Sequence, residues 1–319
     1  MPEEVTMRQF SCSVSSGDEA VDFFSAHNLY HSFTQPEFMA EHLDFLISRQ
    51  PANSGYRLEY DDYSGQDPAI VYGEKTCLIS QPWEKMNKGE TLLYASYPLL
   101  EVQRQHNSWL TAYSAAVSLD DSGILLLGKS GAGKTSVAID LARRYDAKLI
   151  GNDLTIIGKP EDRLLIKGGT KFLFLRLTSI RKSLPDLVSL FPGQEREPWR
   201  YKIKVKPEDL EIQTRVSPVA VKKIFSLHID EEQTNLYFAN DQKLATKLFL
   251  IENFSRYIRG SCINVLGGAD SEQLGYIPSY DREELFAFRR DLVEEIIQKI
   301  IYISGPLKLV TDYIAQARN

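Results

Sequence analysis

The chain has 319 residues, enough for one large or two ordinary domains, and 43% of them are hydrophobic, as in a typical globular protein. The formal net charge of −6, without a basic stripe, argues against sequence-independent nucleic-acid binding, so we expect no nucleic-acid partner. The acidic N-terminus does not resemble a signal peptide and no apolar run is long enough to span a bilayer, which predicts a cytoplasmic protein with no membrane partner.

Residues 1–110 predict a smaller α+β domain, with a mostly β domain as the alternative. The spacing of apolar residues indicates a helix over Pro36–Arg49. Short strands are expected at Tyr56–Tyr60, Ala69–Tyr72 and Thr76–Ile79, with turn-rich segments between them. This part carries no clear catalytic motif, so we expect it to recognise the acceptor or a partner.

Residues 111–319 predict an α/β domain. Strands at Ala115–Leu119 and Ile124–Leu127 precede a glycine-rich loop, and a helix is expected over Lys134–Tyr145. The next strand, Lys148–Gly151, ends at Asn152-Asp153. Strand, loop, helix and strand in this order indicate a βαβ unit, the beginning of an α/β sheet.

The rest of the domain continues with mixed elements. Apolar runs predict strands at Leu154–Ile157, Leu164–Lys167, Phe172–Leu177 and Val221–Ile229. The polar, proline-containing stretch Arg181–Asp209 is expected to form a loop or lid. Helical spacing predicts helices over Gln242–Arg259 and Asp281–Ile303, and a last helix after Pro306.

The glycine-rich loop matches GxxxxGK[ST] from Gly128 to Thr135. Its glycines allow backbone N–H groups to point into one concavity, and the positive end of the following helix dipole faces a bound anion. Lys134 is expected to reach the β- and γ-phosphates, and Thr135 to place its hydroxyl on Mg²⁺. The residues expected to bind a nucleoside triphosphate are Gly128, Ser130, Gly131, Ala132, Gly133, Lys134, Thr135 and Ser136.

A carboxylate follows the next strand. The carboxyl ends of parallel strands face the ligand crevice, so Asp153 is expected to hold Mg²⁺ directly or through water. Asp230 is a rival, because it follows the apolar strand Val221–Ile229, but it opens a solvated acidic run. In both cases a turn or capping role is the alternative interpretation.

The run from Gly123 to Ile157 resembles the nucleotide site of the HPr kinase/phosphorylase family and of the related phosphoenolpyruvate carboxykinases. In both groups a phosphate-loop helix is followed at short spacing by a strand that ends in two aspartates. The pair Gly168-Gly169 with Lys171 is similar to a Gly-Gly segment of the carboxykinases. The similarity covers about 50 residues and does not extend to the first hundred.

The resemblance implies a phosphate-loop kinase domain of the HPr-kinase/PEP-carboxykinase type that transfers a γ-phosphoryl group to a serine-type hydroxyl. It implies that Lys134 and Thr135 are the phosphate and metal groups, and that Asp153 is a metal ligand. The first aspartate of the pair, which in the HPr kinases resembles the general base, is Asn152 here, which can only position a hydroxyl. Tyr113 stands where many HPr-kinase-like proteins have a histidine.

Other polar residues have weaker signals. The basic stretch Arg196–Lys206 is expected either to clamp the acceptor or triphosphate or to be a solvated edge strand. Its candidates are Arg200, Lys202 and Lys204, and single candidates elsewhere are Arg176, Arg181 and Arg259. The histidines and the widely spaced cysteines show no metal-ligand pattern.

The leading hypothesis is therefore an ATP- and Mg²⁺-dependent kinase, with Lys134, Asp153 and Asn152 as its catalytic group. Its acceptor is expected to be a hydroxyl of a small metabolite, amino acid or peptide. The alternatives are a non-catalytic nucleotide-binding regulator and a kinase acting on a protein serine. A homo-oligomer is compatible with all three.

Overall fold

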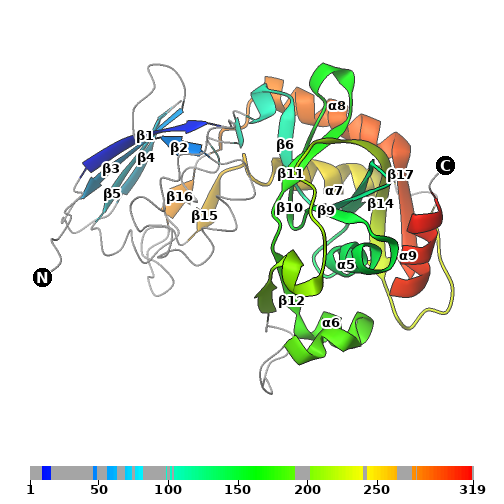
Figure 1. Ribbon diagram of the computed structural model, residues 1–319. Coiled ribbons are helices and arrows are strands. Elements are labelled where there is room, and N and C mark those ends of the chain that lie inside the picture. The colour runs from blue at the N-terminus through cyan, green and yellow to red at the C-terminus, as the bar shows by residue number, and fades with distance from the viewer. Residues whose placement is uncertain are drawn as a thin grey trace, which may run out of the picture. The chain divides into compact units, whose positions relative to one another are not determined.

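The computed structural model is a mixed α/β protein that divides into two compact units (Figure 1). One unit comprises Met1–Asn107 with Ser255–Phe288, and the other comprises Ser108–Phe254 with Arg289–Asn319. The residues that the structure describes are 9–15, 46–48, 56–62, 69–73, 76–81, 98, 101–102, 104–190, 202–239, 243–263, 275–277 and 279–317.

The first unit is built on a five-stranded sheet of order β2-β1-β3-β5-β4. Its strands are β1 (Gln9–Ser15), β2 (Leu46–Ser48), β3 (Tyr56–Asp62), β4 (Ala69–Tyr72) and β5 (Thr76–Gln81), and a separate pair joins β15 (Ser261–Ile263) to β16 (Gly275–Ile277). The side chains of Cys77 and Ile79 are fully buried. Three of these strands lie where alternation predicted strands, but Leu46–Ser48 is a strand rather than the end of the helix predicted over residues 36–49. The earlier part of that helix lies outside the described residues.

The second unit is organised around an eight-stranded mixed sheet of order β6-β10-β11-β14-β8-β7-β9, with β17 paired to β14. The strands are β6 (Trp109–Tyr113), β7 (Ala115–Leu119), β8 (Ser122–Leu127), β9 (Lys148–Gly151), β10 (Leu154–Gly158), β11 (Leu165–Gly169), β14 (Val219–Ile229) and β17 (Ile300–Gly305). Strands β8, β14 and β17 are parallel neighbours, so their carboxyl ends meet at one edge of the sheet. This edge carries the phosphate loop.

Helices α5 (Lys134–Tyr145) and α9 (Leu307–Gln316) pack side by side on one face of that sheet (Figure 1). The core between them contains Leu126 of β8, Val137 of α5, Phe225 of β14 and Val310 of α9, all fully buried. Burying such side chains stabilises a domain by about 1.5–3 kcal/mol each. The loop between β8 and α5 is therefore anchored in the best-packed part of this unit.

The remaining helices begin or end at residues that differ from the predicted bounds. Helices α7 (Lys243–Ser255) and α8 (Glu283–Lys299) lie within predicted helices, but the predicted helix over Asp281–Ile303 stops early, because Ile300–Gly305 leaves it as β17. The isoleucines of residues 300–303 fit helical spacing, but β-branched residues also suit strands. The parallel partner strand, β14, is distant in sequence, so the pairing cannot be seen in the local pattern. The stretch expected as a loop, Arg181–Asp209, contains the end of α6 (Leu177–Ser183) and all of β13 (Lys202–Val205), which pairs with β12 (Leu173–Arg176).

Among the described residues, no helix combines the length and the apolar character required to cross a membrane.

Candidate functional site

The glycine-rich loop runs from the end of β8 into the first turn of α5. Gly133, the residue before the helix, has a left-handed backbone (φ 93°), and a Cβ atom there would lie 2.2 Å from Cγ1 of Ile229. The Ile229 N–H donates to the carbonyl of Ala132 at 3.0 Å. Because β14 approaches so closely, only glycine fits at residue 133, and the strand fixes the shape of the loop.

The loop offers backbone N–H groups to an anion. Lys129, Ser130 and Gly131 are exposed, and Gly131 is left-handed (φ 82°). Within the described chain, α5 has no acidic residue in its first turn and no side chain capping Gly133, whereas Ser136 is buried in that turn. The first N–H groups of a helix have no partners inside it, so this end of α5 suits a phosphate.

Lys134 lies inside the loop with only 5% of its surface exposed. Its ammonium donates to the carbonyls of Gly128 at 2.9 Å and Lys129 at 3.1 Å. The same Nζ lies 4.2 Å from the centre of the Tyr113 ring. An ammonium has three hydrogens, so two hold the loop in shape and one can be donated to a bound phosphate.

Burial lowers the pKa of Lys134 from 10.5 to about 8, and the nearby negative charge of Asp153 opposes that decrease. Between these two pH values the unfolded chain holds this proton and the folded chain releases it, so the contribution of Lys134 to folding stability rises with pH there. A bound phosphate has the opposite effect on the pKa, because an anion favours the charged ammonium.

We therefore expect ATP affinity to decrease by roughly tenfold per pH unit above about pH 8, since binding must then be accompanied by proton uptake at Lys134. Titration calorimetry in buffers of different ionisation enthalpy measures both the affinity and the proton uptake. Lys134→Arg is the control, because arginine keeps its charge and should bind without the decrease. An equal decrease in that variant would show that another group titrates.

Asn152 lies at the carboxyl end of β9, fully buried, beside the first turn of α5. The Thr135 hydroxyl donates to its Oδ1 at 2.8 Å, and its Nδ2 donates to the carbonyl of Phe172 at 3.4 Å. The amide thus orients Thr135, whose hydroxyl oxygen retains lone pairs for a cation. This arrangement matches a positioning role and supplies no proton acceptor.

Asp153 occupies the centre of a tight turn after β9. Leu154 N–H donates to the carbonyl of Asn152 at 2.7 Å, and Asp153 takes a left-handed backbone with φ 61°. The Ser114 N–H donates to the Asp153 carbonyl at 3.2 Å, which connects the turn to the residue just before β7. The half-buried carboxylate is close enough to Lys134 to affect its pKa. The structure therefore brings Lys134, Thr135, Asn152 and Asp153 together from two separate segments.

Lys171 holds the backbone that leads into this turn. Its ammonium donates to the carbonyls of Ile150, just before Asn152, and of Arg215, the latter at 2.8 Å. Gly169 lies against Gly151: a Cβ atom added to Gly151 would lie 2.9 Å from the Cα atom of Gly169. Gly169 and Lys171 thus shape the backbone next to Asn152-Asp153.

The rival aspartate has a different setting. Both oxygens of the Asp230 carboxylate accept hydrogen bonds within its own turn, from the Glu232 N–H at 3.0 Å and from Nε2 of Gln233 at 3.2 Å. This is the turn-capping alternative rather than a cation site. Arg176 is half-buried on β12, Arg181 is exposed on α6, and Arg259 belongs to the other unit. Arg196 to Tyr201 lie outside the described residues, as do the side chains of Lys202 and Lys204.

Two contacts at the site have no signal in the sequence. Asn253 of α7 accepts the Tyr113 N–H at 2.7 Å and donates to the Tyr113 carbonyl at 2.9 Å, which holds the ring beneath Lys134. The carbonyl of Phe172 receives the Asn152 amide. In both contacts an asparagine side chain pairs with main-chain atoms of a residue distant in sequence, and every residue type carries such atoms.

Comparison with known proteins finds no matching protein-family model and no matching curated protein. Among solved structures, the chain matches that of the Hpr(Ser) kinase/phosphatase from Coxiella burnetii, with 13% sequence identity and a TM-score of 0.26. The match covers 66% of this chain and 99% of that one. Agreement at this level does not establish a function.

Proposed function

We propose that this chain is an ATP- and Mg²⁺-dependent kinase, with a phosphate-loop fold, that transfers the γ-phosphoryl group to a hydroxyl of a small metabolite, amino acid or peptide. The observation that carries the proposal is the meeting of Lys134 and Thr135 with Asn152-Asp153 at the N-terminus of α5. A phosphate loop alone indicates only binding. A carboxylate beside it adds a group that can act on the acceptor or on a metal ion.

The residues fit Mg²⁺ as a resident cofactor. Thr135 and Asp153 offer hard oxygen ligands, which Mg²⁺ prefers, and both lie at the phosphate end of α5. The described part of the chain contains no group of three or more His, Cys, Asp or Glu side chains suited to a metal. Such a sparse set is typical of Mg²⁺, which is usually held by one or two protein ligands together with phosphates and water. When bound, Mg²⁺ would neutralise charge on the β- and γ-oxygens.

In the proposed reaction the acceptor oxygen forms a bond to the γ-phosphorus while the bond to the β–γ bridging oxygen breaks, and ADP leaves. The hydroxyl proton passes to the carboxylate of Asp153, because the amide of Asn152 cannot accept it. Lys134 and the loop N–H groups stabilise the charge on the phosphates throughout. Asn152 keeps Thr135 in place.

The test is transfer of labelled γ-phosphate from ATP to a panel of hydroxyl compounds, which includes free serine and threonine, sugars and serine peptides. We expect turnover that requires both an acceptor and Mg²⁺ and that is lost in Lys134→Met. ATP binding without any acceptor-dependent turnover across the panel would contradict the kinase proposal.

One observation favours a second candidate, a nucleotide-binding regulator without catalysis. The residue in the position of the first aspartate is a fully buried asparagine whose amide is already hydrogen-bonded on both sides. For such a protein ATP would raise the melting temperature with the logarithm of its concentration above Kd, and the transfer assay would stay negative.

A further inference from the structure

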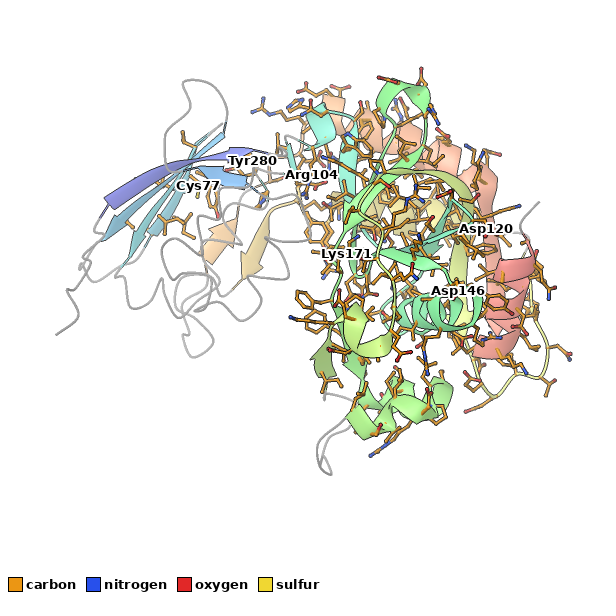
Figure 2. All side chains as sticks on the ribbon, in the orientation of Figure 1. Cys77, Arg104, Asp120, Asp146, Lys171 and Tyr280 are labelled. Carbon is orange, nitrogen blue, oxygen red and sulfur yellow. The ribbon has the colours of Figure 1, made fainter. Side chains whose placement is uncertain are left out.

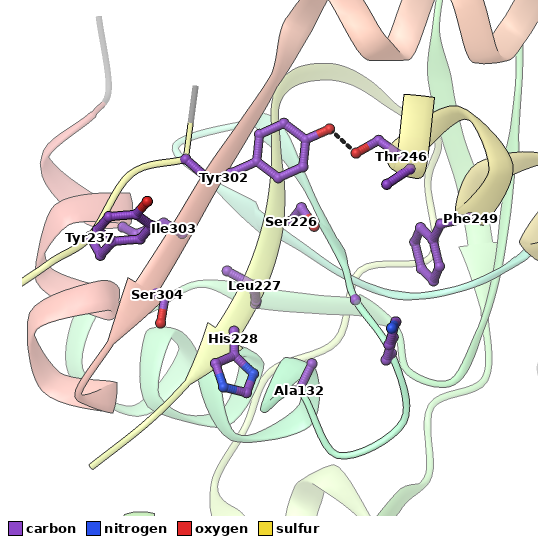
Figure 3. Close-up of a pocket in the computed structure, with 14 residues that line it drawn as sticks. Ala132, Ser226, Leu227, His228, Tyr237, Thr246, Phe249, Tyr302, Ile303 and Ser304 are labelled. Carbon is purple, nitrogen blue, oxygen red and sulfur yellow. Dashed lines mark hydrogen bonds between the residues drawn. The ribbon is translucent and has the colours of Figure 1, made fainter. Parts of the chain in front are cut away.

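A pocket of about 470 Å³ lies beside the phosphate loop, within the same unit (Figure 3). Gly128, Lys129 and Ala132 of the loop form one side. The ends of β14 and β17, the helix α7 and residues 237–239 form the other sides. Small-molecule sites typically have volumes of about 300–1,000 Å³, so the space suits a ligand that also contacts the loop.

The pocket is on the face of the sheet opposite α5. Leu227 of β14 and Ile303 of β17 belong to the core packed with α5 and α9. Neighbouring residues of a strand point to opposite faces, so Ser226 and Tyr302 point to the other side, toward α7. The hydroxyl of Tyr302 donates to Oγ1 of Thr246 on α7, which confirms this orientation (Figure 3).

The walls are held in place without a ligand. The side chains of Tyr302 and Thr246 are hydrogen-bonded. In addition, Tyr237 and Ser304 of β17 exchange two backbone hydrogen bonds, each 2.9 Å long. The side chain of Ser304 is also hydrogen-bonded to Gln233. Because these contacts already exist, a ligand does not have to supply the free energy of ordering these walls.

The lining selects the kind of ligand. Among the residues that the structure describes, the lining contains the aromatic side chains of Tyr237, Phe249 and Tyr302 and the imidazole of His228, includes no Asp or Glu, and has Lys129 of the loop as its only Lys or Arg. A charged acceptor such as an amino acid would find no carboxylate there for its amino group. The lining also excludes Thr135, Asn152 and Asp153, the residues that an acceptor hydroxyl must approach. An uncharged aromatic ring joined to phosphates suits this lining, because it needs no carboxylate partner and does not have to reach Thr135, Asn152 or Asp153.

We infer that this pocket holds the base and ribose of the nucleotide, with the base against the aromatic side chains of α7 and β17, while the triphosphate occupies the loop. The inference rests on the proposed nucleotide-binding function. It assigns the two faces of the loop separate tasks: the Gly128–Ala132 side receives the nucleoside, and the Thr135–Asp153 side receives the metal ion and acceptor.

The test compares ATP with inorganic tripolyphosphate, which lacks the nucleoside, by titration calorimetry. ATP should bind at least about tenfold more tightly than tripolyphosphate, the effect expected from stacking one base on an aromatic side chain. Ala245→Trp, which fills the pocket from α7, should remove this advantage and leave tripolyphosphate binding within about twofold of the original. Phe249→Ala, which removes a stacking surface, is the second variant.

Leu244→Trp is the matched control, because Leu244 precedes Ala245 on α7, is 71% exposed and does not line the pocket. It should change neither affinity, and the melting temperatures of all three variants verify that they fold. Equal binding of ATP and tripolyphosphate to the unmodified protein would overturn the inference while leaving phosphate binding intact. Binding of neither compound would overturn the proposed function together with the inference. Unchanged ATP affinity in both pocket variants would assign the pocket to another ligand.

Discussion

Lys134→Met is expected to weaken ATP binding at least about 100-fold, because hydrogen bonds to charged groups contribute about 1.5–3 kcal/mol each and the phosphates lose their cation. Methionine retains the length of the buried stem and removes only the ammonium. The unliganded variant should melt close to the original at neutral pH, because the loss of the two hydrogen bonds to the Gly128 and Lys129 carbonyls is offset by removal of a buried charge, whose cost lowers the pKa of Lys134. Titration calorimetry and thermal melting measure the two effects.

The control for this variant is Lys148→Met. Lys148 is exposed at the start of β9, at the opposite end of that strand from Asn152. The same loss of charge there should leave ATP affinity unchanged. If Lys134→Met binds ATP as tightly as the unmodified protein, the loop is not the phosphate site.

Asp153→Asn is expected to lower the rate of phosphoryl transfer about 100-fold or more, the usual contribution of a general base. Asparagine has nearly the same shape and, like aspartate, accepts a left-handed backbone, so the turn at φ 61° should persist. ATP binding measured without Mg²⁺ should be retained, because the substitution removes a negative charge, and that charge repels the phosphates of ATP. A loss of both binding and transfer would instead indicate a structural role.

The matched control is Asp120→Asn, an exposed aspartate that also has a left-handed backbone, in the turn that precedes β8 (Figure 2). It should not change the transfer rate. A second readout separates chemistry from structure. Without the charge of Asp153, which raises the pKa of Lys134, the decrease of ATP affinity should begin at a lower pH.

The loop and the helix after it were predictable because their signals are local. Each loop glycine, Lys134 and Thr135 occurs within eight consecutive residues, and helix α5 spans Lys134–Tyr145 as its spacing predicted. Asn152 and Asp153 were predictable as the end of a strand. Their roles in binding and catalysis stay predictions, whereas their proximity to Thr135 and Lys134 is a property of the structure.

Other parts depend on contacts between distant segments. Residues 300–303 satisfy helical spacing but become part of β17, because pairing with β14 gives their backbone a partner that helical spacing does not reveal. The pocket beside the loop combines residues from β14, β17 and α7, and no short motif connects them. Strand β6, which was not predicted, is likewise defined by its pairing with β10.

Strand β6 ends the order of its sheet, so within the described part of the chain no strand lies on its outer side. Unpaired edges are templates on which other chains can add a strand and aggregate. At Tyr113 the side chain of Asn253, only 6% exposed, supplies one acceptor and one donor, as a neighbouring peptide unit would. Helix α7 therefore covers this edge at Tyr113 and also forms a wall of the pocket. If α7 detached, the edge of β6, the strand whose Tyr113 ring contacts Lys134, would become available for pairing with another copy of the chain.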